Sequence, residues 1–198
     1  MSKLALFDFD GTITTKDTMA ALAQYQEGKT AYLLALARLS PVLIQYKLKL
    51  IPNTKAKTSF LTYFFGGLQE EQFNRLCQSF ANEIIPGLIR PGALKKIEAL
   101  KKANYRVTVV SASAENWVKP WTEKYSLDLL ASTLEVQNNL ITGKLVGENC
   151  YGEEKVRRLK NYLDINQYEE IQAYGDTSGD LPMLKMASEN FSFYKPFR

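Results

Sequence analysis

Residues 3–12 read Lys-Leu-Ala-Leu-Phe-Asp-Phe-Asp-Gly-Thr, an apolar run that ends abruptly in two carboxylates and a glycine. The run predicts a buried strand that leads into a loop. Because residues i and i+2 of an extended chain point the same way, Asp8 and Asp10 would present their carboxylates to one side. Gly11 lets the backbone turn sharply, and Thr12 can hydrogen-bond back into the loop. Two oxygen ligands at the carboxyl end of a strand favour a hard cation such as Mg²⁺ over a simple polar turn.

Composition restricts the classes of protein to which the chain can belong. Of its 198 residues 45% are hydrophobic, and 25 Lys and Arg against 21 Asp and Glu give a formal net charge of +4. These values exclude a disordered chain and fit one domain with or without an insertion. So mild a charge does not indicate a nucleic-acid partner. The sequence has no histidine, which excludes an imidazole base, a Ser-His-Asp triad and a His-containing zinc site.

Cysteine spacing and the N-terminal residues favour a cytoplasmic protein. Cys77 and Cys150 lie far apart without C-x-x-C spacing, which favours free thiols over a disulfide. The apolar run before Asp8 is too short for a signal peptide, whose apolar core needs roughly 7–15 residues. The most apolar region, residues 31–52, is interrupted by charged residues and a proline, so it does not resemble a transmembrane helix of roughly 18 apolar residues.

Hydrophobic periodicity divides the chain into two parts. Residues 16–86 have helical spacing, and after residue 87 strand-like and helical segments alternate, which predicts an α/β fold with a parallel sheet covered on both faces. We therefore expect a core of residues 1–15 and 87–198 and an inserted helical cap of residues 16–86. The expected helices are 19–25, 31–46 with a break at Pro41, 54–65, 73–84, 90–103, 114–124, 153–163 and 179–187. The expected strands are 3–8, 105–110, 129–136, 141–145 after a hairpin turn, 170–174 and 191–194.

Two further polar motifs follow predicted strands. Residues 109–113 (Val-Val-Ser-Ala-Ser) place Ser111 at a strand end, where its hydroxyl and nearby backbone N–H groups suit a phosphoryl oxygen. Ser113 would then cap the following helix. Asp176 ends another strand, and Asp180 adds a carboxylate in the first turn of the next helix. Carboxylates gathered at two strand ends repel one another without a cation, so the sequence predicts a divalent metal site.

Four motifs in order resemble those of the haloacid dehalogenase superfamily: DFDGT from Asp8, VVSAS from Val109, G-x-x-K from Gly152 to Lys155, and GDTSGD from Gly175. The resemblance covers nearly the whole chain. The helical insertion directly after the first motif is similar to the phosphoserine-phosphatase-like branch. The resemblance implies a Rossmann-like three-layer core with an all-helical cap, and a Mg²⁺-dependent phosphatase that acts on a small-molecule phosphomonoester.

The resemblance also implies catalytic roles. Asp8 would attack phosphorus to form an aspartyl-phosphate, and Asp10 would act first as general acid and then as general base. Ser111 would bind the phosphoryl group, and Lys155 would neutralise the transferring charge. Spacing alone does not distinguish Lys155 from a solvated lysine on an amphipathic helix. The dehalogenases and P-type ATPases lack an acid at the position of Asp10, so its presence favours phosphomonoester hydrolysis or transfer.

The same resemblance implies how metal and substrate would be held. The Asp8 carboxylate, the Asp10 backbone carbonyl and Asp176 would bind Mg²⁺. Asp180 would hold a metal-bound water or orient Lys155. The residues expected to contact the substrate are Phe9, Thr12, Asp17, Ser111, Ala112 and Lys155.

Two departures from the family pattern argue against phosphoserine as the substrate. Asp17 stands where phosphoserine phosphatases use a Glu shortly after the first motif. Residues 53–68, where an Arg is expected, contain only Lys55 and Lys57 as cations. A lysine cannot reproduce a bidentate clamp on a carboxylate.

The predicted cap is rich in Leu, Tyr and Phe, notably in residues 31–51 and 60–65. We expect these side chains to form the cap's own core. The alternative is an apolar surface that serves a lipid phosphate, similar to the insertion of bacterial phosphatidylglycerophosphatases, with residues 31–52 in contact with a membrane. A phosphotransferase using the same intermediate is a further alternative. A catalytically silent binding protein is disfavoured because Asp8, Asp10 and Lys155 are all present, and the oligomeric state is left open.

Overall fold

A computed structural model describes residues 2–198 and contains a five-stranded parallel sheet in the order β3-β2-β1-β6-β7. Its strands are β1 (Ser2–Phe7), β2 (Tyr105–Ala114), β3 (Asp128–Ser132), β6 (Tyr168–Gly175) and β7 (Ser192–Tyr194). β1 pairs with β2 on one side and β6 on the other. Because all three run the same way, their carboxyl ends meet at one edge of the sheet.

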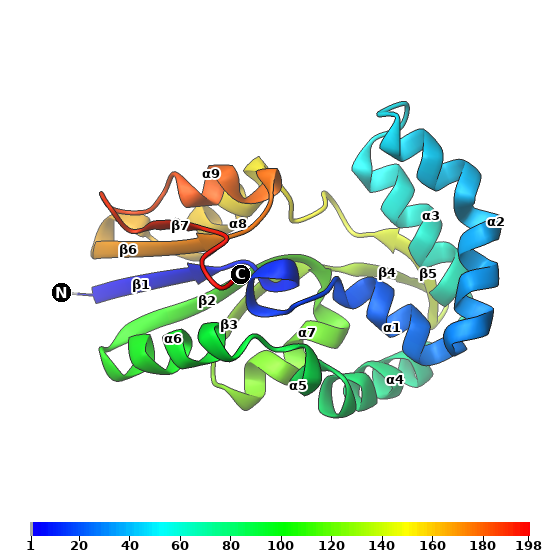
Figure 1. Cartoon of the computed structure of the whole chain (residues 1–198), viewed down its shortest axis with the longest axis horizontal. Helices are drawn as coiled ribbons and strands as arrows, with labels where there is room; N and C mark the ends of the chain where they lie inside the picture. Colours follow the sequence, from blue (N-terminus) through cyan, green and yellow to red (C-terminus); the bar gives the residue numbers. More distant parts are fainter. Residues whose placement is uncertain (1) are drawn as a thin grey trace.

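Helices cover both faces of the sheet, as the alternating sequence predicts (Figure 1). Successive residues of β1 face opposite sides. Ala5 and Phe7 belong to one buried cluster, and Leu4 and Leu6 belong to the other. One face is covered by α5 (Ile85–Leu88), α6 (Pro91–Lys102) and α7 (Glu115–Lys124), and the other by α8 (Glu153–Tyr162) and α9 (Leu181–Leu184). The expected three-layer parallel core is therefore confirmed.

Four helices follow β1 and lie beyond the carboxyl ends of the strands (Figure 1). They are α1 (Thr18–Glu27), α2 (Lys29–Lys47), α3 (Asn53–Phe65) and α4 (Glu70–Glu83). An antiparallel hairpin of β4 (Leu134–Gln137) and β5 (Leu140–Leu145) packs against α3. Gly143 permits this contact, because a Cβ there would lie 2.3 Å from the Cα of Thr62. A two-stranded sheet thus accompanies the helices at this end, and the division into core and cap at residues 16–86 stays a prediction.

Short turns complete the chain. A single irregular helical turn spans Phe9–Ile13, and 3₁₀ turns span Ile165–Gln167 and Ser178–Asp180. No helix among residues 2–198 is long and apolar enough to cross a membrane.

Three expected elements are wrong in detail. The helix expected to break at Pro41 is continuous, because the Ala37 carbonyl, which would accept from an N–H at position 41, accepts the Ser40 hydroxyl instead (2.7 Å). The strand expected at 129–136 is two strands, since the chain leaves the main sheet after Ser132 to form the hairpin. The helix expected at 179–187 divides into a 3₁₀ turn and the short α9.

Candidate active site

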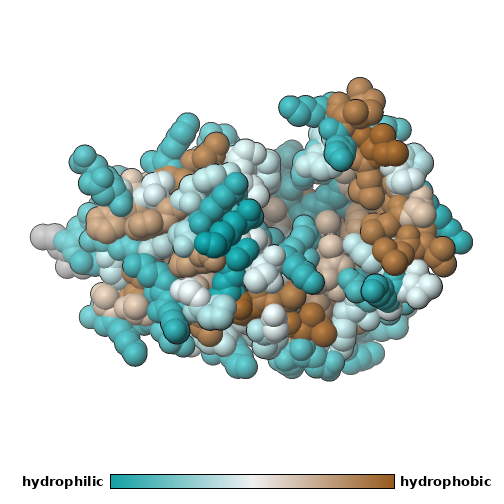
Figure 2. Space-filling view, viewed as in Figure 1, coloured by the Kyte–Doolittle hydropathy of each residue, from teal (hydrophilic) through white to brown (hydrophobic). Residues whose placement is uncertain are grey.

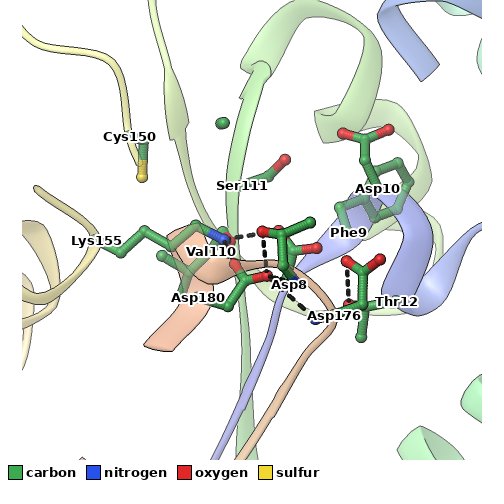
Figure 3. Close-up of polar contacts among 12 residues, drawn as sticks. Asp8, Phe9, Asp10, Thr12, Val110, Ser111, Cys150, Lys155, Asp176 and Asp180 are labelled. Atoms are coloured by element: carbon green, nitrogen blue, oxygen red, sulfur yellow. Dashed lines mark hydrogen bonds and ion pairs between the residues drawn. The ribbon is translucent and has the colours of Figure 1, made fainter. Parts of the chain in front are cut away.

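A buried lysine lies between two buried aspartates at the carboxyl edge of the sheet. Lys155, in the first turn of α8, donates to Asp8 Oδ1 at the end of β1 and to Asp180 Oδ1 after β6, both at 2.7 Å. A third hydrogen bond of 2.7 Å goes to the carbonyl of Val110 in β2. Figure 3 shows the ammonium group between the two carboxylates. The fold therefore holds Lys155 away from solvent and against Asp8, which spacing alone did not predict.

Asp176 brings a third carboxylate to this cluster. One carboxylate oxygen from each of Asp8, Asp176 and Asp180 lies within 4.8 Å of the others. Asp180 Oδ2 accepts from the N–H groups of Asp176 (3.1 Å) and Thr177 (2.9 Å), which fixes the loop after β6. The loop after β1 approaches closely at Gly11, where φ is +83° and a Cβ would lie 2.5 Å from Asp176 Oδ2.

The charges of this cluster suit a hard cation. Three carboxylates face two cationic partners among residues 2–198, Lys155 and Arg198, whose guanidinium contacts Asp176. The donors are all oxygens, as Mg²⁺ prefers. The Asp8 and Asp176 carboxylates that the sequence predicts as ligands are thus brought together. The Asp180 side chain is committed to Lys155 and to the loop after β6, which fits the expected role of orienting Lys155.

Burial and neighbouring charges shift the pKa values of Asp8, Asp180 and Lys155 in opposite directions. Burial raises the pKa of Asp8 to about 7, and Lys155 opposes that rise. Although burial raises the pKa of Asp180, Lys155 holds it below its ordinary value. Burial lowers the pKa of Lys155, but Asp8 and Asp180 together raise it above its ordinary value. Lys155 is therefore a fixed positive charge beside Asp8.

Asp10 points away from Lys155 (Figure 3) and toward the start of α1. Its carboxylate accepts from the Thr18 N–H at the start of α1 (2.6 Å) and from the Ser113 hydroxyl (2.6 Å). Burial and then the charge of Asp17 raise the pKa of Asp10 to about 6, against the effect of the two hydrogen bonds. A carboxyl group with a pKa near neutrality suits proton transfer in both directions.

The remaining predicted residues of the first loop have structural contacts. Thr12 donates to Asp176 Oδ1 at 3.3 Å, and the buried Phe9 ring lies 5.3 Å from that of Trp121. The Asp17 side chain accepts from the Ala20 N–H at 3.0 Å and caps α1.

The second motif differs from expectation at its last serine. Ser113 does not cap α7, whose N-cap is Ala114, because its hydroxyl is engaged by Asp10. Ser111 is fully buried, and its hydroxyl accepts from the Ser113 N–H at 3.0 Å. Ala112 and Ser113 line the cavity described next.

A cavity of about 510 Å³ lies over these residues. Its floor includes Asp8, Asp10 and Lys155 from the sheet edge. Its opposite wall comes from the helices that follow β1 and is largely apolar, with Met19, Leu43, Tyr46, Ala56 and Phe60. The site therefore combines a charged floor with a roof of apolar side chains that is interrupted by Asp17, Asn53 and Lys57.

Lys57 lines the cavity although it is not among the site residues predicted from the sequence. It extends from α3 to the other wall, where it donates to the Ala112 carbonyl and to Asn149 Oδ1 (2.8 Å). Burial lowers its pKa to about 8. Asn149 is itself held by the Ser132 hydroxyl (2.9 Å) and by Asn53 of α3 (3.2 Å). No sequence signal marks Asn149, whereas Lys57 was visible as one of two cations where an Arg was expected.

Comparison with known proteins assigns the family. A family model for haloacid dehalogenase-like hydrolases matches residues 5–185. "Protein CicA" of Caulobacter vibrioides is 34% identical, over 98% of this chain and 86% of that protein. The "Phosphoserine phosphatase" of Campylobacter jejuni subsp. doylei is 25% identical over 98% of this chain and 87% of its own. The chain therefore belongs to the haloacid dehalogenase-like hydrolase family.

Solved structures agree with this fold. A Bordetella pertussis protein of unknown function matches 94% of this chain and 87% of its own with a TM-score of 0.83 at 20% identity. A "Phospho-Aspartyl Intermediate Analogue of Phosphoserine phosphatase" matches 94% of this chain and 83% of its own, with a TM-score of 0.68 and 24% identity. Within the family, this chain is a phosphatase of the phosphoserine-phosphatase-like branch.

Proposed function

We propose that the protein hydrolyses a small phosphorylated metabolite with Mg²⁺ through an aspartyl-phosphate on Asp8. The observation that carries the proposal is the placement of Asp8 at the cavity floor with Oδ1 bound by Lys155. Among residues 2–198 no hydrogen bond reaches its other oxygen, Oδ2. That oxygen is available to attack phosphorus in line with the leaving oxygen.

The other residues supply protons and charge. As the bond from Asp8 to phosphorus forms, the ester P–O bond breaks, and Asp10 donates a proton to the leaving oxygen. Asp10 then accepts a proton from the water that hydrolyses the acyl phosphate. Lys155 and the hydroxyl of Ser111 stabilise charge on the phosphoryl oxygens, and Asp180 keeps Lys155 in place.

The acidic cluster would hold Mg²⁺ through the Asp8 and Asp176 carboxylates and the Asp10 carbonyl. When bound, Mg²⁺ offsets the repulsion between substrate and the aspartates. We place the enzyme in the cytoplasm, which its two free cysteines support.

The substrate's organic part would face the cap side of the cavity. Relatives are named phosphoserine phosphatases, but this wall presents Lys57 and apolar side chains rather than an arginine. A lysine accepts a single anionic oxygen and does not select the planar carboxylate geometry. These features favour a phosphomonoester with one further anionic or polar group over phosphoserine itself.

The test is phosphate release from a panel of phosphomonoesters with Mg²⁺ or with EDTA, for the wild type and Asp8→Asn. The panel contains phosphoserine, phosphoethanolamine, sugar phosphates and a lipid phosphate, each with and without an added alcohol acceptor. Release that needs Mg²⁺ and is lost in Asp8→Asn supports the proposal. Release that survives in Asp8→Asn refutes the nucleophile, and transfer to the acceptor without net hydrolysis refutes hydrolase as the function.

A further inference from the structure

Helix α2 is apolar on the side that faces solvent as well as on the side that packs. Its inner face buries Ala35 and Leu39 in the core of the cap helices. Its outer face and the turn that follows carry five large aliphatic side chains, each between 55% and 70% exposed. We name these five residues the cap patch: Leu33, Leu34, Ile44, Leu48 and Leu50. A surface helix of this kind ordinarily carries polar residues outward, so a second apolar face indicates a binding surface.

The cap patch is continuous along the helix. Leu33, Ile44 and Leu48 are separated by eleven and four residues and share one face with the small exposed residues Ala37 and Pro41. Figure 2 shows apolar side chains gathered over α2 and the turn at its end, on the outermost part of the molecule. This is a convex apolar ridge rather than a groove that receives a peptide.

Basic residues surround the cap patch, and acidic residues are absent from it. Residues 28–69 contain six Lys and Arg and no Asp or Glu, so the rest of the chain carries a formal net charge of −2. Five of the six cations are exposed: Lys29, Arg38, Lys47, Lys49 and Lys55. Lys47 and Lys49 alternate with Leu48 and Leu50 at the end of α2. Long basic side chains can lay their methylenes along apolar surface while the charge reaches lipid phosphates.

We propose that the cap patch docks the protein on the surface of an anionic lipid bilayer. The combination of aliphatic side chains with flanking lysines and no acid is typical of helices that lie in the headgroup region. Leu43 and Tyr46 of the same helix line the catalytic cavity, so docking brings the cavity within about one helix diameter, roughly 10 Å, of the headgroups.

Vesicle flotation tests this proposal without any turnover. Purified full-length protein is mixed with vesicles of phosphatidylcholine alone or of equal parts phosphatidylcholine and phosphatidylglycerol. We expect binding to the anionic vesicles only. The double variant Leu48→Ser/Leu50→Ser should weaken binding at least tenfold, and Lys47→Glu/Lys49→Glu should weaken it at least about fivefold for each lysine replaced. Added salt should weaken the binding of the wild type.

A charge-matched variant away from the cap patch tests whether binding depends on the patch or only on the net charge of the protein. Lys102→Glu/Lys160→Glu makes the same change in charge at exposed positions of α6 and α8 and should bind as the wild type does. Circular dichroism and hydrolysis of a water-soluble phosphomonoester should be unchanged in the Leu48/Leu50 variant. Absence of binding to anionic vesicles, or equal binding by the patch and core variants, overturns the proposal. A dimer that is broken by Leu48→Ser/Leu50→Ser, with no lipid binding, would assign the face to a second copy instead.

Discussion

Replacing Lys155 by methionine should destabilise the metal-free protein in a way that depends on pH. The side chain makes three 2.7 Å hydrogen bonds, to Asp8, Asp180 and the Val110 carbonyl, and is 1% exposed. Methionine fills a similar volume but leaves two buried carboxylates without a cation. Removing one partner of a buried ion pair costs about 3–5 kcal/mol, and we expect this loss at about pH 8.5 with EDTA.

The direction of the pH dependence follows from the pKa of Asp8, which burial raises from 3.8 to about 7. That rise corresponds to ~4 kcal/mol. Between these two values the folded protein keeps a proton that the unfolded chain has lost, so the free energy of unfolding falls as pH rises through this interval. Without Lys155 the pKa of Asp8 rises further, and the fall in the variant continues above about pH 7.

Urea unfolding followed by tryptophan fluorescence measures this directly, since Trp117 and Trp121 are both buried. The difference between wild type and Lys155→Met should shrink at about pH 5.5, where Asp8 is protonated, and also when saturating Mg²⁺ binds the folded state. Lys160→Met, an exposed change on the same helix, is the control and should differ little from wild type. Equal stability of Lys155→Met and wild type at the alkaline pH would refute the reasoning.

Two further substitutions test the loop after β1 and the cap wall. Gly11→Ala should raise the Mg²⁺ concentration for half-maximal activity at least tenfold, because its Cβ would meet Asp176 at 2.5 Å. Gly28 also has a positive φ, in a region that is essentially restricted to glycine, but a Cβ there would meet no atom within 4 Å. Gly28→Ala should therefore lose about 1–3 kcal/mol of stability and keep the wild-type dependence on Mg²⁺; equal metal dependence in the two variants would contradict us. Lys57→Met should raise KM at least tenfold for substrates with a second anionic group and change kcat less, with Lys55→Met as the exposed control. The KM of the wild type should rise toward that of Lys57→Met above about pH 8, where Lys57 loses its proton. An unchanged KM in Lys57→Met would exclude Lys57 from substrate binding.

The sequence predicted the core because its signals there are local. An apolar run that ends in Asp8 marks a central strand, and the same pattern recurs before Ser111 and Asp176. Parallel pairing then places these strand ends side by side whatever the loops do. The sequence did not predict that the hairpin of residues 134–145 would pack on α3, because that contact joins segments about 80 residues apart.

The sequence indicates most of the residues that form the site, but it does not indicate which side chains they contact. Lys155 could be selected only by resemblance, since burial of a lysine depends on two distant carboxylates. The sequence predicts a helix cap at Ser113, because nothing near it in the chain shows that the Asp10 carboxylate accepts its hydroxyl. Lys57 and Asn149 come from separate segments that meet only in the folded chain.

Trapping the phosphorylated residue tests the central claim most directly. Asp10→Asn lacks the acid of the first step as well as the base of the second, so it should accumulate the aspartyl-phosphate from an ester whose leaving oxygen needs no proton. We would incubate this variant with Mg²⁺ and p-nitrophenyl phosphate, whose leaving group departs as a stable anion, quench with acid and locate the phosphoryl group by peptide mass spectrometry. The account predicts a phosphoryl group on Asp8, absent from Asp8→Asn/Asp10→Asn. A phosphoryl group on any other residue would contradict it.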